Sequence, residues 1–329
     1  MNLRKATRRH QQTSSNLEIM RHLFTATAAA AVFLALHAGE AAAQQTRINA
    51  ILIPHEGNPS RIWINEATET QVRYYDTEVT TALSNIPRSQ VRSVFFEEPT
   101  SLSTAIQQFR GRDYQTAMQG FSRVAAEYRP VRALPGNPST RAAFFEIECL
   151  RLLGEYGRMS EKLGEINKSG LIRENELRQL ELNLMWEAVG SEAWDRLERL
   201  VRQRADSDMP GNQRAQVAYC AGLVHHQKGE TREAIDAYNE AMIVDAGASE
   251  VVARLAVTGI LRIFDEDPEV QEAREAWGTE NERPDSDGHV RLLEAGAVAR
   301  IYETFIGAEF PLPDAYMPYL EYKAPDSES

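Results

Sequence analysis

The sequence predicts a mainly α-helical protein, built from paired helices and preceded by a short β-rich segment. Helical periodicity begins near Ser101 and persists to about Ile306. The clearest pair lies between Gln213 and Asp245, where a tight turn separates two helices with small residues at helical spacing. Before the helices, apolar residues alternate with polar ones between Arg47 and Phe96, which is typical of short strands. A chain of 329 residues with 43% hydrophobic content is long enough to bury a large core.

Residues 1–43 are typical of a cleaved signal peptide. A basic dipeptide precedes an uninterrupted small and apolar run from Leu23 to His37, and Ala41-Ala42-Ala43 follows it. The run has roughly 15 residues, which is short for a bilayer span, so we expect cleavage before Gln44 rather than a membrane anchor. Residues 1–19 have no periodicity and Met20 stands where a signal peptide normally begins, which indicates either a misplaced start codon or a long n-region.

The expected exported chain is strongly acidic. Removing five basic and two acidic residues from totals of 36 and 48 leaves 31 and 46, a net charge of −15. This charge should repel nucleic acid and anionic membrane surfaces, so we expect neither as a partner. The only cysteines, Cys149 and Cys220, lie in apolar helices of different pairs, which favours buried thiols, although an oxidising compartment would allow a disulfide.

Residues 44–99 predict a small sheet of four or five strands. The turn Glu56-Gly57-Asn58-Pro59 separates the first two strands, and the last run ends in alternating apolar residues at Phe96. The apolar alternation runs through Ile48, Ala50 and Leu52, then Ile62 and Ile64, then Val72 and Tyr74, and finally Ile86 to Phe96. We expect this segment to pack on the first helix pair and to cover the open end of the helical region.

Residues 100–307 predict five helix pairs and a final helix. The expected turns lie at Gly111, Gly154, Gly190 and Gly229, and Pro268 starts the second helix of the fifth pair. In order, the expected pairs cover Ser101 to Pro130, Ser139 to Leu163, Glu174 to Ala205, Gln213 to Asp245 and Glu250 to Trp277, and the final helix covers His289 to Gly307. Residues 308–329 form a tail whose prolines exclude a regular helix, but whose tyrosines predict that it lies along the last helices or binds something.

The pair from Gln213 to Asp245 resembles the tetratricopeptide repeat (TPR) family. Counted from Ala215, the small residues Gly222, Gly229, Ala234 and Ala241 and the aromatic Tyr238 occupy the places that the family pattern gives to such residues. Ala218, Thr231 and Ala246 depart from the pattern, where Trp, Tyr and Pro are usual. The run from Ile86 to Phe96 is similar to small barrel-like domains that precede TPR arrays in some bacterial envelope proteins. The resemblance implies a right-handed α-solenoid behind a small β domain.

No motif for catalysis or a cofactor is present in the sequence. It lacks G-x-G-x-x-G, G-K-[ST], G-x-S-x-G and H-E-x-x-H patterns, so we expect no cofactor and no enzyme activity, with an unrecognised active site as a third possibility. His225 and His226 are adjacent and diverge by about 100° on a helix, so they predict packing rather than a metal site. The acidic run from Asp265 to Glu269 lacks the spacing of a calcium loop and reads as a solvated turn.

The TPR resemblance selects a candidate partner-binding groove, because first helices of such pairs line the concave surface at places 2, 5, 9 and 12. The selected residues are Phe144, Glu148 and Arg151 in the second pair and Gln216, Tyr219, Leu223 and His226 in the fourth. We call these seven residues the inner-face set. They predict a mixed polar and apolar surface for an extended peptide or a helix, or alternatively a groove that is partly filled by packing.

The sequence therefore predicts an exported, periplasmic or secreted, non-enzymatic scaffold or adaptor that binds a protein partner. The alternative is a passive structural or polymer-binding component of the cell surface. The lysine-based clamp that some TPR proteins use for a C-terminal carboxylate is not expected, because none of the lysines that follow Gln44 is placed for it.

Overall fold

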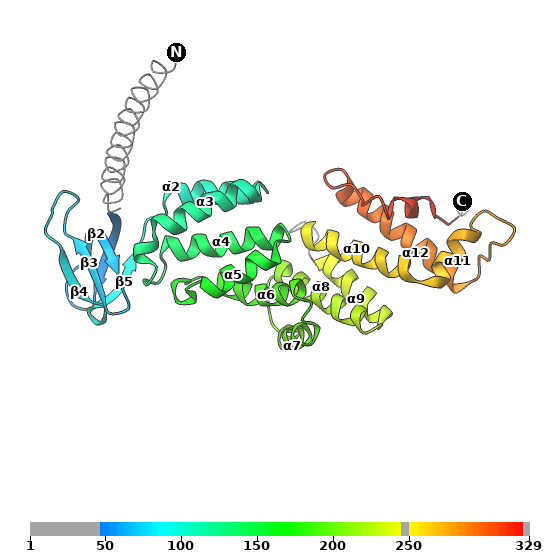
Figure 1. Cartoon of the computed structure of the whole chain (residues 1–329), viewed down its shortest axis with the longest axis horizontal. Coiled ribbons are helices and arrows are strands. Elements are labelled where there is room, and N and C mark those ends of the chain that lie inside the picture. Colours follow the sequence, from blue (N-terminus) through cyan, green and yellow to red (C-terminus); the bar gives the residue numbers. More distant parts are fainter. Residues whose placement is uncertain (1–46, 245–249, 325–329) are drawn as a thin grey trace, which may run out of the picture. The chain divides into compact units, whose positions relative to one another are not determined.

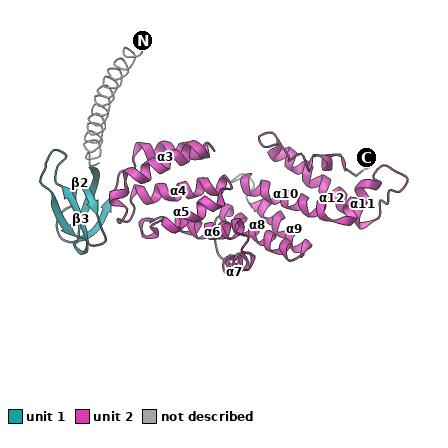
Figure 2. Cartoon of the chain, in the orientation of Figure 1, with its two compact units in different colours: residues 1–95 teal, residues 96–329 magenta. Residues whose placement is uncertain are grey.

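The structure, a computed structural model, describes residues 47–244 and 250–324. The expected signal peptide, its cleavage site and the last five residues of the tail lie outside the described residues. The chain divides after Phe95 into two compact units, and each is described by itself (Figure 2). Within the described ranges, no helix combines the length and apolar character that a membrane crossing requires.

The first unit is a five-stranded antiparallel sheet with the strand order β4-β3-β2-β1-β5. Its strands are β1 (Ile48–Pro54), β2 (Ser60–Ala67), β3 (Gln71–Tyr75), β4 (Ser84–Pro87) and β5 (Val91–Phe95). The expected alternation is confirmed in β1, β2 and β3, where Ile48, Ala50, Leu52, Ile62, Ile64 and Val72 are all buried. It does not continue in β5, where Val91 is buried but Phe95 is exposed.

This sheet must curl strongly. The edge strands β4 and β5 are joined only by a 3₁₀ turn, Arg88–Gln90. In a flat sheet four strand spacings of about 4.8 Å would separate them by roughly 19 Å, whereas the linker reaches at most about 14 Å. The short linker therefore brings the two edges toward each other.

The second unit is helical, and Figure 1 shows its helices following one another along the chain. Its eleven described α-helices are α2 (Thr100–Arg110), α3 (Tyr114–Glu127), α4 (Pro138–Leu152), α5 (Tyr156–Glu165), α6 (Glu174–Gly190), α7 (Trp194–Arg204), α8 (Gly211–Gln227), α9 (Thr231–Val244), α10 (Glu250–Glu266), α11 (Pro268–Ala276) and α12 (Asp287–Tyr302). Each second helix of the first four pairs also contacts the first helix of the next pair, and α2, α4, α6, α8 and α10 contact one another in that order.

Four of the turns share one hydrogen-bond pattern. The left-handed residues are Arg112, Gly154, Glu192 and Gly229, with φ between 52° and 73°. In each turn the left-handed residue donates its N–H to the carbonyl three residues back, and the next residue donates to the carbonyl five residues back. This is the Schellman arrangement, which satisfies the last carbonyls of a helix.

The expected turns are present at Gly111, Gly154 and Gly229, and the third turn begins one residue after Gly190. Gly111 has an ordinary negative φ, and the left-handed residue beside it is Arg112. Gly190 is the last residue of α6, and a Cβ there would lie 2.3 Å from the Cβ of Tyr156. Gly190 is therefore needed for the close approach of α5 and α6 and not for the turn.

The expected fifth pair, α10 with α11, is also corrected. Arg291 near the start of α12 pairs at 2.7 Å with Asp267, which directly follows α10 and caps α11. Arg254 near the start of α10 lies 4.1 Å from the ring centre of Phe310, just beyond α12. The antiparallel partner of α10 is therefore α12, and α11 is a short helix between them that contacts both.

The tail packs on the last helices, which is the first of the two alternatives that the sequence predicts for it. After α12 the chain makes a π-helical turn, Glu303–Gly307, and later a 3₁₀ turn, Met317–Glu321. Leu312, Tyr319 and Tyr322 are buried in the same core cluster as α12. The Tyr319 hydroxyl donates to Asp265 Oδ1 at 2.9 Å, and Arg300 donates to the Tyr322 carbonyl at 2.6 Å.

Candidate functional site

Three polar members of the inner-face set, Glu148, Arg151 and Gln216, are joined through α6. Asn183 Nδ2 on α6 donates to Glu148 Oε1 on α4 at 2.7 Å. Gln179, one turn earlier on α6, exchanges two hydrogen bonds of 3.0 Å with Gln216 on α8. Gln216 Oε1 also accepts from Trp186 Nε1 at 2.8 Å. Three successive first helices are thus tied together by side chains whose polar groups have partners.

Arg151 is part of the same network. Its Nη2 donates to Glu148 Oε2 at 2.8 Å, and its guanidinium lies 5.7 Å from the centre of the Trp186 ring. Both members of the ion pair have only 7% of their side-chain surface exposed. The charge of Arg151 is therefore already matched within the fold, so a partner group would have to displace Glu148 to pair with it.

An aromatic column runs beside this network. Tyr156, Trp186, Tyr219 and Tyr238 come from four different helices, and their successive ring centres lie 5.8, 5.5 and 5.7 Å apart. Burial raises the pKa of Tyr219 far above its usual range. Burial likewise raises the pKa of Tyr156 to about 12. These hydroxyls therefore remain protonated at physiological pH and offer no acid–base chemistry there.

Of the two alternatives for the inner-face set, an open binding surface and a groove partly filled by packing, the burial of its residues supports the second. Between 3% and 7% of the surface of Phe144, Glu148, Arg151, Gln216, Tyr219 and Leu223 is accessible. Phe144 packs edge-on against Phe145, with ring centres 5.3 Å apart. Close packing of α4, α6 and α8 through long side chains covers these residues, so most of the expected groove is filled.

Three residues of the set nevertheless meet at an open recess. Tyr219, Leu223 and His226 line a hollow of about 530 Å³ with Gln227 and with residues of α6, α7 and α10. The remaining lining residues are Val189, Glu192, Trp194, Arg262 and Glu266. His226 Nε2 lies 3.0 Å from Glu266 Oε2, whereas Arg262 forms no salt bridge with any carboxylate in residues 47–244 and 250–324. We call this hollow the recess.

Sequence reasoning missed the α6 residues that complete the site. Once Glu192 is aligned with Gly229, the places of Gln216, Leu223 and His226 correspond on α6 to Gln179, Trp186 and Val189. The signal was hidden because the third pair carries Glu where a left-handed glycine is usual.

A larger hollow lies among the last helices, away from the recess. It encloses about 730 Å³ between α9 and α12, over the C-terminal half of α10. Its rim carries charges of both signs, including Arg232, Asp236 and Glu294. No residue of the inner-face set lines it, so we call it the outer hollow and keep it separate from the recess.

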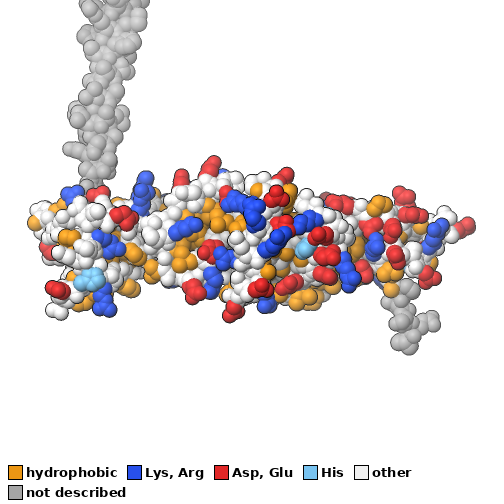
Figure 3. Space-filling view, turned by 90° about the horizontal axis from the view of Figure 1, so that it is seen from below, with side chains coloured by type: hydrophobic (Ala, Val, Ile, Leu, Met, Phe, Trp, Pro, Cys, Tyr) orange, Lys and Arg blue, Asp and Glu red, His pale blue; other side chains and the backbone are white. Residues whose placement is uncertain are grey.

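Charge is unevenly distributed along the helical unit. Residues 265–324 contain 15 acidic and 5 basic residues, which is most of the net charge of the chain. Figure 3 shows acidic side chains dominating the C-terminal end on the face that it displays, with basic side chains gathered nearer the middle. The part of the molecule beyond the recess therefore repels anionic partners.

The cysteines carry no bond in this structure. Cys149 and Cys220 are both buried and free. Burial raises the pKa of Cys149 to about 12 and that of Cys220 further, so neither thiol is a ready nucleophile. Among the described residues, no group of three His, Cys, Asp or Glu side chains is arranged to hold a metal ion.

Comparison with known proteins adds no relative. No protein-family model matches the chain, and neither the characterised proteins nor the solved structures contain a significant match.

Proposed function

We propose that this chain is an exported, non-enzymatic interaction scaffold of a bacterial envelope, which binds a protein partner at the inner face of a right-handed TPR-like solenoid. The support for the solenoid is the order of contacts among first helices and the turn pattern repeated at Arg112, Gly154, Glu192 and Gly229. Recurring units that contact only their neighbours are typical of such arrays.

The observation that carries the binding proposal is the recess. Tyr219, Leu223 and His226 were selected from TPR places alone, and they line one hollow with residues of the two flanking repeats. Aromatic and arginine side chains are the commonest anchors of protein interfaces, and the recess offers both in Trp194 and Arg262. Its size suits one or two partner side chains, so we propose that it anchors an extended or helical segment.

Affinity capture of the tagged protein from its own cells tests this proposal. We expect a stoichiometric protein partner, and we expect Arg262→Glu to reduce its recovery at least tenfold, because the substitution reverses an exposed charge in the recess. Arg214→Glu, an exposed charge reversal on α8 outside the recess, is the matched control and should leave recovery unchanged. Recovery of glycans alone, or of nothing, would favour the alternative of a passive surface component.

A further inference from the structure

Asn167 begins the one Asn-x-Ser/Thr motif of the sequence whose middle residue is not proline. This pattern, here Asn167-Lys168-Ser169, is the acceptor motif for N-linked glycans, and it is used where it lies in a surface loop of an exported protein. Two other asparagines, Asn58 and Asn137, are followed by Pro-Ser and do not fit it. A three-residue motif also occurs by chance, so the surroundings of Asn167 in the fold decide whether it can serve.

The motif lies in the loop between α5 and α6. Helix α5 ends at Glu165, and the 3₁₀ turn Lys168–Gly170 follows Asn167 before α6 begins. Asn167 has extended backbone angles, φ −80° and ψ 93°, and is partly exposed, while Lys168 and Ser169 are exposed. A transferase can therefore approach the whole motif without unfolding a helix.

The hydrogen bonds of Asn167 leave its amide nitrogen available. Ser169 Oγ donates to Asn167 Oδ1 at 2.7 Å, and Asn167 Nδ2 donates to the Arg132 carbonyl at 2.8 Å. The amide nitrogen carries two hydrogens, and only one of them is used by this bond within the described ranges. Attachment of a sugar replaces one hydrogen, so the modified nitrogen still has an N–H for the Arg132 carbonyl.

The loop also tolerates rotation of Asn167 toward an enzyme. The Arg132 carbonyl accepts a second hydrogen bond, from Asn137 Nδ2 at 3.3 Å, so it keeps a partner when Asn167 turns outward. The loop itself stays attached, because the Gly136 N–H donates to the Gly170 carbonyl at 2.9 Å. Asn137 has the opposite character, since it is fully buried and caps α4.

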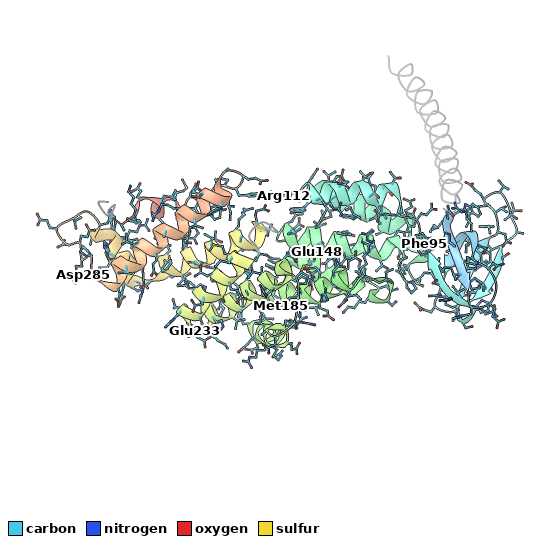
Figure 4. The ribbon with its side chains drawn as sticks, turned by 180° about the vertical axis from the view of Figure 1, so that it is seen from behind. Phe95, Arg112, Glu148, Met185, Glu233 and Asp285 are labelled. Atoms are coloured by element: carbon cyan, nitrogen blue, oxygen red, sulfur yellow. The ribbon has the colours of Figure 1, made fainter. Side chains whose placement is uncertain are left out.

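A glycan on this loop leaves the recess free. The loop precedes α6, whereas Val189, which lines the recess, is close to the C-terminal end of that helix. Helix α6 has 17 residues and is therefore about 25 Å long. Figure 4 labels Met185, which lies in the half of α6 that is nearer to the recess. The motif and the recess are thus separated by the length of one helix.

We propose that Asn167 is an N-glycosylation site. The donor is a glycan linked to a polyprenyl diphosphate, and Asn167 Nδ2 bonds to its anomeric carbon. The bond from that carbon to the diphosphate oxygen breaks, the lipid diphosphate leaves, and the amide gives up one proton to the transferase. This inference rests on the export that the proposed function includes. It adds a modification that binding at the recess does not require.

The mass of the intact protein tests the proposal. The protein is purified under denaturing conditions from the exported fraction of its own cells, so that any polymer bound without a covalent bond is removed. We expect a form that is heavier than the polypeptide by the mass of a glycan, with the whole increase on the peptide that contains Asn167. An exported protein whose Asn167 peptide is entirely unmodified would overturn the proposal.

Four variants make the test specific. Asn167→Gln and Ser169→Ala should each remove the heavier form, whereas Ser169→Thr should keep it, because the motif accepts either hydroxyl. Asn175→Gln changes an exposed asparagine of α6 outside the motif and should also keep it. Thermal melting checks that all four variants are folded. A heavier form that persists in Asn167→Gln would place the glycan elsewhere and contradict the assignment.

Partner capture separates this inference from the proposed function. We expect Asn167→Gln to recover the partner as well as wild type does, because the recess lies beyond the other end of α6. If exported protein captures its partner but carries no glycan, the glycosylation site is wrong and the binding function stands. If the protein is glycosylated but captures no protein, the binding function fails and the site stands. Absence of the protein from the exported fraction would overturn both.

Discussion

At the scale of single residues, Tyr238 shows how glycine placement determines packing. Its ring lies between two helices that each supply a glycine: a Cβ on Gly222 would lie 2.5 Å from the ring, and one on Gly259 would lie 2.9 Å from it. Tyr238 is fully buried, so the ring has no direction in which to move. The small residue that the sequence pattern placed at Gly222 is therefore required by this contact.

We expect Gly222→Ala to destabilise the fold by about 1 to 3 kcal/mol, since overpacking forces shifts in a filled core. Gly157→Ala is the matched control, because no atom lies within 4 Å of a Cβ at that helical site. It should be neutral or stabilising, by up to about 1 kcal/mol, because alanine favours helix more than glycine does. Urea unfolding of the two variants shows whether each substitution lowers or raises the free energy of unfolding.

Arg151→Ala should destabilise the protein far more than the substitution of an exposed charged residue does. It leaves Glu148 buried with an unmatched charge, so we expect the free energy of unfolding to fall by about 3 to 5 kcal/mol. Adding Glu148→Ala should recover part of this loss, although Asn183 then loses its acceptor. Thermal melting of the single and double variants measures the coupling, and equal, small effects in both would show that the pair is solvated.

The buried tyrosines predict alkaline instability. Burial raises the pKa of Tyr238 from 10.0 to about 12. Because the folded-state pKa is the higher one, this stabilisation is present in full below pH 10 and is lost as the pH rises through 12. Tyr238→Phe should therefore flatten the fall in unfolding free energy between pH 10 and 12, by on the order of 2 kcal/mol. An unchanged pH slope would mean that the hydroxyl ionises freely in the folded protein.

At the scale of elements, the repeated turn determines the register of the array. The residue five places after each left-handed residue is fully buried. These equivalent residues are Ala117, Met159, Leu197 and Ala234. We expect Gly229→Ala to cost about 1 kcal/mol, because it places a Cβ in a left-handed conformation without any new contact. Gly164→Ala, in the regular helix α5, should show no such loss in the same unfolding experiment.

The sequence was sufficient to predict local features. The strand alternation around Ile62, the turns at Gly154 and Gly229 and the N-terminal start of α11 at Pro268 follow from neighbouring residues, and the structure agrees with each. Met159 stands where the TPR pattern usually has alanine, and it is still buried, because that site accepts either a small or a large apolar side chain.

Features that depend on distant segments were not predictable in this way. The pairing of α10 with α12 brings together Arg291 and Asp267 from segments that α11 and a loop separate, while the pattern at Pro268 favours the nearer helix. Glu148 and Gln216 read as exposed because charged and amide side chains usually are, and their burial depends on matching partners from α6. The recess was partly predicted, because its α8 residues follow a repeat pattern whereas Arg262 does not.

At the scale of the whole helical unit, two hollows are candidates for the partner-binding site. The recess is lined by inner-face residues, and the outer hollow is larger but shares none of them. Volume alone therefore does not identify the site. The proposed binding function depends on the recess, where residues at TPR-like positions also line an open surface.

Photocrosslinking in the native cells tests this claim most directly. A photoreactive phenylalanine analogue is placed at Gln227 in the recess, at Asp236 in the outer hollow, or at the exposed Gln203 on α7 as a control. If the recess binds the partner, we expect one dominant protein crosslink from Gln227, which is lost on Arg262→Glu and absent from the other two positions. A dominant crosslink from Asp236, with none from Gln227, would contradict it.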